Sequence, residues 1–327
     1  MIDVICLGEL LIDMVCKEKD TGLEEGKTFI KAPGGAPANV AVAISRLGLR
    51  CGFIGKVGED PFGIFLINLL NNESIDTSYL EKINGVRTTI VFVGNKKDQT
   101  KDMVFYRNPG ADMFISSNQV DKKYFKEAKV FHFGSISLIN DESRNATLKA
   151  ITVAKKNNLI ITYDPNYRVD LWGEINDPKV IMRSVLKDVD IVKVSEEEWK
   201  MFTGEDDFIK GGKGITAKGV KLVIVSMGEK GCFYYTNRFN GYVNGFKVDV
   251  VETTGAGDAF IGAVISWLIR NNVIKDDLGS LSEDKIKEML IFANAAGALA
   301  TTKIGAIPSL PTTEGLNRFL RIKKNQM

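Results

Sequence analysis

The sequence predicts a doubly wound α/β fold, in which helices cover both faces of a mainly parallel sheet. From about residue 128 onwards, short apolar runs alternate with helical segments, which is the order that such folds show. The runs VFHFGS, LIITYDP, IVKVS and KLVIVS are short and mainly apolar, as expected of parallel strands buried on both faces. We expect helices between or after these strands at 142–157, 177–187, 257–271 and 283–302.

The N-terminal third has a different pattern, in which strand-like runs predominate. A single amphipathic stretch, PANVAVAISRLG, interrupts them at 37–48, and we expect a helix that ends at Gly48. Turn residues separate the strand-like runs from one another. The expected strands lie at 2–8, 10–16, 52–58, 88–94 and 102–108.

Composition excludes several classes of partner. Of the 327 residues, 44% are hydrophobic, which is enough for a large core. Lys and Arg number 43 and Asp and Glu number 41, and this balance is not that of a nucleic-acid-binding surface. No apolar run reaches the ~18 residues of a membrane helix, and the acidic N-terminal segment differs from a signal peptide. We therefore expect no nucleic-acid partner and no membrane partner.

The cysteines and the single histidine exclude further chemistry. Cys6, Cys16, Cys51 and Cys232 are scattered without a CxxC pair, which indicates reduced thiols, a cytoplasmic location and no cysteine metal site. The only histidine is His132, inside an expected strand. Neither a Ser-His-Asp triad nor a His-rich metal site is therefore available.

The ends of the expected parallel strands are where ligand contacts should gather. In open α/β sheets, ligands bind beyond the carboxyl ends of the strands. Residues that are mostly small or polar stand at the ends of the four runs named above. These residues are Gly134-Ser135, Asp164-Pro165-Asn166, Ser195-Glu196 and Met227-Gly228.

The segment ETTGAGDAFIGAVI (252–265) is the strongest indication of chemistry. Gly255, Ala256 and Gly257 are small and precede an apolar helix, so free N–H groups and the helix dipole would favour a phosphoryl group. Asp258 lies in the first turn, either as a structural acid or as a general base. We expect the base, with a pKa that the helix N-terminus lowers, which a loose phosphoryl-transfer transition state tolerates. The segment is not a GxGxxG fingerprint, and the chain has no GxxxxGK[ST] loop.

A second glycine-containing segment, GGAPANVAVAISRLG, lies at 34–48. Gly34 and Gly35 would let a ligand approach the backbone closely. Asn39 lies early in the expected helix, where its amide could bond a polyol. The alternative is an ordinary glycine-rich loop that precedes a helix.

Together these segments resemble the two signatures of the PfkB, or ribokinase-like, family of carbohydrate kinases. GGAPANVAVAISRLGLRCGFIGKVG is similar to the N-terminal signature and TTGAGDAFIGAVI to the C-terminal one, in the same order and at a wide separation. The resemblance implies one ribokinase-like domain over 1–327, an α/β sandwich with a small β-sheet lid from roughly 10–33 and 86–112. It also implies ATP and Mg²⁺, direct in-line transfer of phosphate to a primary hydroxyl, and a role for Asp258 as the base.

The resemblance also assigns residues to the sugar. GELLID (8–13) resembles the start of these kinases, in which the acid at the place of Asp13 binds sugar hydroxyls. FYRNPGAD (105–112) resembles the lid of fructokinases, and Arg107 would then reach the sugar from above. A solvated charge on an exposed strand is the alternative for Arg107. The sugar would thus contact Asp13, Gly34, Gly35, Asn39, Arg107 and Asp258.

On the nucleotide side, the resemblance covers several short segments. DPNYR, SMGEKG and FANAAGALATTKIGAIPS are similar to segments near the phosphates, ribose and adenine in this family, although a surface Arg and plain helix packing are alternatives. Family members commonly have Asn-x-x-Glu where this chain has SEEE, with Ser195 at the Asn place and Glu198 able to hold Mg²⁺ through water. They commonly have Asp where this chain has Glu252, a candidate ligand for a monovalent cation such as K⁺. The expected ATP contacts are Arg168, Lys193, Ser226, Gly228, Gly231, Asn294 and Ala298.

We therefore expect an ATP-dependent kinase that converts fructose to fructose 6-phosphate. The alternatives within the family are a kinase for 2-keto-3-deoxygluconate or for ribose. A catalytically silent sugar- or nucleotide-binding relative is the alternative from another class. Exposed edges of the lid sheet would allow a homodimer through the lids.

Overall fold

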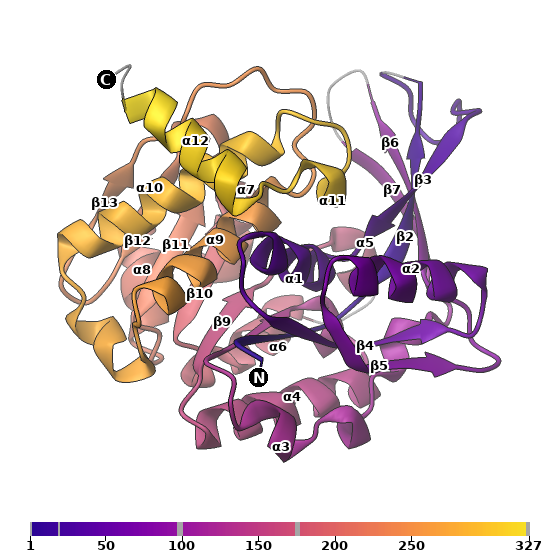
Figure 1. Ribbon diagram of the computed structural model, residues 1–327, viewed down its shortest axis with the longest axis horizontal. Helices are drawn as coiled ribbons and strands as arrows, with labels where there is room; N and C mark the ends of the chain where they lie inside the picture. The colour runs from indigo at the N-terminus through magenta and orange to yellow at the C-terminus, as the bar shows by residue number, and fades with distance from the viewer. Residues whose placement is uncertain (1, 19, 97–100, 174–176, 325–327) are drawn as a thin grey trace.

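The computed structural model describes residues 2–18, 20–96, 101–173 and 177–324. Two sheets and their flanking helices make up the described part of the chain (Figure 1). Residues 97–100 of the predicted lid segment lie outside the described residues, as do the two ends of the predicted 1–327 domain. Within the described ranges, no helix combines the length and the apolar character that crossing a membrane requires.

The larger sheet has nine strands in the order β13-β12-β11-β10-β9-β8-β1-β4-β5. All neighbours from β5 to β11 pair in parallel, and β12 and β13 add an antiparallel edge. The predicted parallel strands are thus confirmed, whereas β5, β12 and β13 were not predicted. The nine strands are β1 (Val4–Leu7), β4 (Cys51–Gly58), β5 (Asp76–Ile83), β8 (Val130–Gly134), β9 (Ile160–Asp164), β10 (Ile191–Ser195), β11 (Leu222–Ser226), β12 (Cys232–Tyr235) and β13 (Asn240–Val243).

Helices cover both faces of this sheet, which confirms the doubly wound α/β class. Alternate side chains of β1 point to opposite faces, so Val4 and Cys6 join one buried cluster and Ile5 and Leu7 the other. The first face carries α1 (Ala36–Arg46), α2 (Pro61–Asn72), α9 (Ala256–Arg270), α10 (Glu283–Ala300), α11 (Ala306–Ser309) and α12 (Thr313–Lys324). The second face carries α3 (Lys122–Phe125), α4 (Asp141–Lys156), α5 (Val169–Trp172), α6 (Pro178–Ser184), α7 (Glu196–Thr203) and α8 (Phe208–Thr216).

A separate four-stranded sheet lies beside the larger one, on the side of α2 in Figure 1. Its strand order is β3-β2-β6-β7, with β2 parallel to β6 and the other two pairs antiparallel. The last predicted strand, 102–108, is too long by two residues, so Arg107 lies beyond the sheet. The strands are β2 (Leu11–Cys16), β3 (Phe29–Gly34), β6 (Ile90–Asn95) and β7 (Lys101–Tyr106).

The carboxyl ends of the parallel strands meet at one edge of the larger sheet. Gly134 at the end of β8 lies opposite Asp164 at the end of β9, and Ser195 at the end of β10 lies opposite Ser226 at the end of β11. The strand-end residues singled out in the sequence are therefore neighbours in space.

Candidate active site

Two adjoining cavities open at this edge of the larger sheet. The first, of about 670 Å³, lies between the two sheets and is lined by Asp13, Asn39, Phe105 and Asp258 among others, and we call it the inter-sheet cavity. The second, of about 1370 Å³, is lined by the ends of β10 and β11 and by α10, and we call it the α10 cavity. Gly257, in the first turn of α9, lines both. A group bound at this helix end could therefore contact ligands in both cavities.

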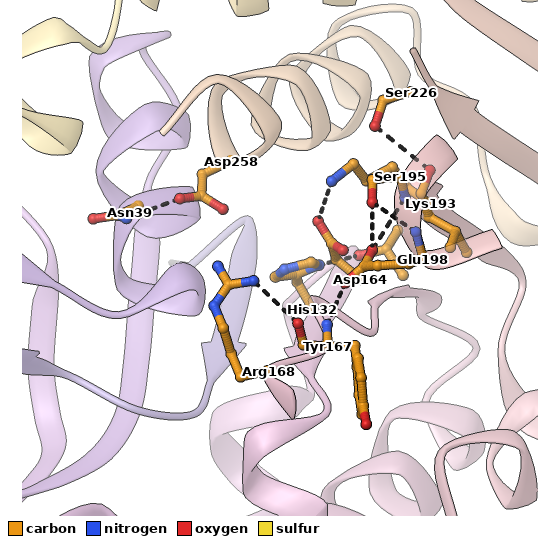
Figure 2. A network of polar contacts seen from close by, with 12 residues as sticks. Asn39, His132, Asp164, Tyr167, Arg168, Lys193, Ser195, Glu198, Ser226 and Asp258 are labelled. Atoms are coloured by element: carbon orange, nitrogen blue, oxygen red, sulfur yellow. Dashed lines mark hydrogen bonds and ion pairs between the residues drawn. The ribbon is translucent and has the colours of Figure 1, made fainter. Parts of the chain in front are cut away.

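Asp258 lies at the N-terminus of α9 and is 8% exposed. One carboxylate oxygen, Oδ2, accepts a hydrogen bond from Asn39 Nδ2 at 2.8 Å (Figure 2). Burial raises the pKa of Asp258 to about 6, although the bond from Asn39 and the charges of Lys193 and Arg168 oppose the rise. The predicted lowering of this pKa is therefore wrong, because desolvation of the carboxylate outweighs the helix dipole.

The first turn of α9 offers the donors that the sequence indicated, with one exception. Gly255 adopts a φ of 85°, a left-handed conformation that glycine adopts without strain, and α9 begins directly after it. First-turn N–H groups have no partner within their own helix. The N–H of Ala256, however, donates to Thr253 O at 3.2 Å, so this predicted donor is already paired. A Cβ on Gly257 would lie 2.8 Å from the Lys193 ammonium, so glycine keeps that cation close to the helix N-terminus.

The residues predicted to bind a sugar gather around the inter-sheet cavity, apart from Arg107. Asp13, Gly35, Asn39 and Asp258 line it. Gly34 does not line it, but a Cβ there would overlap the Asp13 carboxylate, so glycine leaves room for that side chain. The other amide atom of Asn39, Oδ1, is buried without a hydrogen-bond partner. A ligand hydroxyl could satisfy this oxygen.

Arg107 differs from one of its two predicted placements. It is buried, so the alternative of a solvated charge is wrong. Its Nε donates to Asp112 Oδ2 at 2.7 Å, and Arg107 is absent from the lining of the inter-sheet cavity. Because Asp112 follows it by only five residues in a compact turn, the pair forms locally behind the cavity wall. Its Nη2 is buried without a hydrogen-bond partner, and a contact from Arg107 to a ligand stays a prediction.

A buried ion pair lies at the carboxyl ends of β9 and β10. Lys193 Nζ lies 2.8 Å from Asp164 Oδ2, and both side chains are buried. Burial lowers the pKa of Lys193, but the charges of Asp164 and Glu198 outweigh this and raise it. The half-buried Arg168 lines the inter-sheet cavity, and Figure 2 shows it on the Asp258 side of this network. Lys193, Arg168 and the N-terminus of α9 together make the junction of the two cavities favourable for anions.

Glu198 is held by neighbouring backbone groups. Ser195 precedes α7 as its N-cap, and its N–H and Oγ both lie 3.1 Å from Glu198 Oε2. The N–H of Tyr167 donates to the other oxygen of Glu198. Both of its oxygens are engaged and neither cavity includes Glu198, so this geometry fits the predicted contact to a metal through water. The buried Oδ1 of Asp164, which has no partner, is the nearby atom best suited to bond such a water.

The α10 cavity contains the other predicted nucleotide contacts. Asn294 Nδ2 donates to the carbonyl oxygens of Val243 and Asn244, each at 3.1 Å, so only its oxygen remains for an adenine edge. The predicted residues that line this cavity are Lys193, Ser226, Gly228, Gly231, Asn294 and Ala298. Phe246 and Phe319 also line it and were not predicted, because they lie outside the segments that carry the resemblance.

Two further predicted residues have clear partners. Glu252 lines the inter-sheet cavity, and its Oε2 accepts the N–H of Gly305 at 2.8 Å. His132 is buried beside Thr162 Oγ1 at 2.9 Å, and burial lowers its pKa to about 4, which fits the role of a paired strand residue. Among the described residues, no cluster of three or more His, Cys, Asp or Glu side chains could hold a metal.

Glu9 is the main residue of the inter-sheet cavity that the sequence analysis missed. It lies in GELLID, the same segment as Asp13, and it is buried. The presence of a second acid in that segment was the only signal available. Val91 and Phe105, apolar residues of the small sheet, also line this cavity and were not singled out.

Comparison with known proteins finds fructokinases that are similar to this chain over most of its length. Fructokinase-2 from Solanum lycopersicum is 42% identical over 312 residues, which are 94% of this chain and 93% of that protein. A structure of fructokinase from Xylella fastidiosa with bound ATP superposes with a TM-score of 0.90 at 28% identity, over 98% of this chain and 99% of that one. A structure of fructokinase from Vibrio cholerae O395 with fructose, ADP and calcium ion has a TM-score of 0.86 at 34% identity. The match covers 98% of this chain and 99% of that one.

The family resemblance read from the sequence is thereby confirmed, together with the ribokinase-like α/β fold. Residues 1–313 match the pfkB family of carbohydrate kinases, which is nearly the whole chain. Both signature segments, which meet at Asn39 and Asp258, lie within the matched region. This chain belongs to the pfkB carbohydrate kinase family.

Proposed function

We propose that this chain is an ATP-dependent fructokinase, which transfers the γ-phosphate of ATP to the primary hydroxyl at C6 of fructose. The observation that carries the proposal is the position of Asp258, buried at the junction of two cavities and oriented by Asn39. The relatives named above support fructose and ATP as the substrate pair.

In this proposal Asp258 orients the sugar hydroxyl and accepts its proton during direct in-line transfer. Oδ2 is occupied by Asn39, which leaves Oδ1 for the hydroxyl. A pKa of about 6 leaves the carboxylate ionised at neutral pH and a stronger base than an exposed Asp. The first turn of α9, with Gly255 and Gly257, would stabilise the transferring group, and Arg168 and Lys193 would add positive charge.

The charges of the inter-sheet cavity favour a neutral sugar over a sugar acid. Asp13 and Asp258 both line it, and ionised Asp13 would repel a carboxylate. Arg107 is the residue that could have paired with the acid group of 2-keto-3-deoxygluconate. Since Asp112 already neutralises Arg107, this argument for a sugar acid loses its support.

The site also fits the metal ions that we propose. Glu198 and Asp164 would hold Mg²⁺ through water, since Mg²⁺ keeps several waters and needs few direct carboxylates. When bound with ATP, Mg²⁺ supplies positive charge to the phosphates. Glu252 is our candidate for a K⁺ contact, although its bond to Gly305 restricts its reach and favours weak activation.

We further propose that the small sheet acts as a lid and mediates a homodimer. Its two edge strands expose Ile30 on β3 and Val104 and Tyr106 on β7, and Tyr106 is 64% exposed. Pairing of two such edges would bury these side chains. A cytoplasmic location is also proposed, which the four unpaired cysteines support.

The test of the substrate is kcat/KM for fructose, 2-keto-3-deoxygluconate and ribose with ATP and Mg²⁺, measured by ADP release. We expect fructose to have the highest value, because the wrong sugar leaves buried polar groups unpaired. A higher value for 2-keto-3-deoxygluconate would overturn the fructose assignment and leave the family assignment intact. A catalytically silent relative would raise its melting temperature with a sugar and yet release no ADP.

A further inference from the structure

Glu9 is a buried acid in the wall of the inter-sheet cavity that the proposed mechanism does not use. It follows β1 and is 3% exposed. One of its carboxyl oxygens, Oε2, is buried without a hydrogen-bond partner. Burying a carboxyl group is unfavourable unless specific contacts hold it. The contacts of Glu9 therefore indicate what it does.

Glu9 caps helix α1 from a distant part of the chain. Gly35 precedes α1 and has no side chain with which to cap it, and Pro37 has no N–H. The N–H of Ala36 donates to Glu9 Oε1 at 3.0 Å. Glu9 thus provides the acceptor that an N-cap Ser, Thr, Asp or Asn usually provides.

The backbone around this contact is tightly packed. A Cβ on Gly8 would lie 2.5 Å from Pro37 Cγ, and a Cβ on Gly35 would overlap the carbonyl oxygen of Glu9. The segment after β1 is therefore pressed against the first turn of α1. The position of Glu9 determines where this helix begins.

Helix α1 connects this contact to Asp258. The N–H of Asn39 bonds to Gly35 O at 2.9 Å, so Asn39 lies within the turn that Glu9 caps. Its side-chain amide donates to Asp258 Oδ2 at 2.8 Å. A displacement of the first turn of α1 would move Asn39 and release one oxygen of Asp258.

Glu9 also lies close to a charged pair at the junction of the two sheets. Arg107, after β7, and Thr89, before β6, both bond Asp112. Burial raises the pKa of Glu9 to about 8, Asp112 adds to the rise, and Arg107 opposes it. The side chain is therefore uncharged at neutral pH, as a glutamine would be, and gains a charge as the pH rises above about 8.

We propose that Glu9 is a positioning residue for phosphoryl transfer, which fixes the first turn of α1 and acts through Asn39 to orient Asp258. The inference rests on the proposed role of Asp258 as the base. It adds a requirement outside the two signature segments, namely an acceptor at Glu9 Oε1 for the N–H of Ala36.

The test compares Glu9→Met, which removes the acceptor, with Glu9→Gln, which keeps it. We expect Glu9→Met to lower kcat at least about tenfold, because small misplacements of catalytic groups are costly. The KM for ATP should change less than about threefold, since Glu9 is absent from the α10 cavity. Glu9→Gln should restore kcat at pH 7. A kcat of Glu9→Gln as low as that of Glu9→Met would contradict a role as hydrogen-bond acceptor.

A matched control separates positioning from general loss of stability. Asp207 caps α8 through the N–H groups of Ile209 and Lys210, at 2.8 and 2.9 Å, and lines neither cavity. Asp207→Ala should lower the melting temperature and leave kcat unchanged. Equal losses of kcat in Asp207→Ala and Glu9→Met would overturn the proposal, as would an unchanged kcat in Glu9→Met.

The coupling to Asn39 can be measured directly. If Glu9 acts through Asn39, then Glu9→Met should lower kcat much less in an Asn39→Ala background than in the wild type. Additive losses would contradict the proposed route. If Glu9→Met does not fold, a loss of kcat in a folded Glu9→Gln at pH 7 would still refute the proposal, because glutamine keeps the acceptor. Full activity of Asp258→Asn would instead refute the base assignment, which is a separate result.

Discussion

The two cavities are built in different ways. The inter-sheet cavity has buried acids, Glu9 and Asp258, whose pKa values are raised by desolvation. The α10 cavity has several glycines and Ala298 in its wall beside the rings of Phe246 and Phe319, and its acids, such as Glu229, are exposed. Contacts in the first cavity therefore depend on a few desolvated side chains, and those in the second are spread over backbone and small residues. Single substitutions should be much more damaging in the first.

The largest expected effect is that of Asp258→Asn in the inter-sheet cavity. The variant keeps the shape of the side chain and can still meet Asn39, but it cannot accept a proton. General acid–base groups contribute roughly 10²–10⁴-fold, so kcat should fall by that factor. ADP release with saturating fructose and ATP measures it. Calorimetry with ATP alone serves as the control and should show unchanged binding. If the variant kept more than about a tenth of the wild-type kcat, Asp258 would not be the base.

The pH dependence of kcat/KM also tests the inter-sheet cavity, with a smaller expected effect than Asp258→Asn. Asp258 must be ionised to act as a base, and burial raises its pKa to about 6. Below that pH the ionised fraction falls, so kcat/KM for fructose should drop by about tenfold for each pH unit. The ATP affinity, measured by calorimetry at each pH, controls for titration of the nucleotide. A rate that stays constant down to pH 5 would favour a low pKa and would mean that the helix dipole dominates.

Much of this site could be predicted from the sequence, because each signature is local. The glycines around Asp258 and the apolar runs that precede the strand-end residues are readable as patterns. The hydrogen bond between Asn39 and Asp258 could not be predicted from a local pattern, since the two residues lie 219 positions apart. The burial of the Asp258 carboxylate could not be predicted from the sequence either, which is why the predicted direction of its pKa shift was wrong. A helix dipole can be inferred from one segment, but desolvation depends on everything that packs around it.

The remaining errors have local causes. Helix α2 was not predicted, although its sequence signals were present. Asp60 caps it through the N–H groups of Phe62 and Gly63, and Pro61 follows as the first helical residue. The strand β3 escaped because FIKAPG contains Pro and Gly and lies at a sheet edge. The end of the strand at 102–108 was misplaced, because β7 ends at Tyr106 and the turn that follows pairs Arg107 with Asp112.

The smallest effect should come from the α10 cavity, where Ser226→Ala removes a hydroxyl at the end of β11. Ser226 is half-buried and bonds only weakly to Val194 O, at 3.5 Å, so its loss should not disturb the fold. If the hydroxyl bonds ATP, its removal costs about 0.5–1.5 kcal/mol, or roughly threefold to tenfold in the KM for ATP. The kcat and the KM for fructose should stay unchanged, because Ser226 is absent from the inter-sheet cavity.

Ser226→Ala also tests whether the binding energy of the nucleotide is spread over many groups or depends on one side chain. Asp258→Asn is the matched variant, because it also changes one polar group at the same edge of the sheet. A rise of a hundredfold or more in the KM for ATP would show that the α10 cavity depends on one side chain, as the inter-sheet cavity does. The contrast between the two cavities would then fail. A rise below tenfold would support the view that backbone groups and the close approach allowed by Gly228 and Gly231 hold the nucleotide.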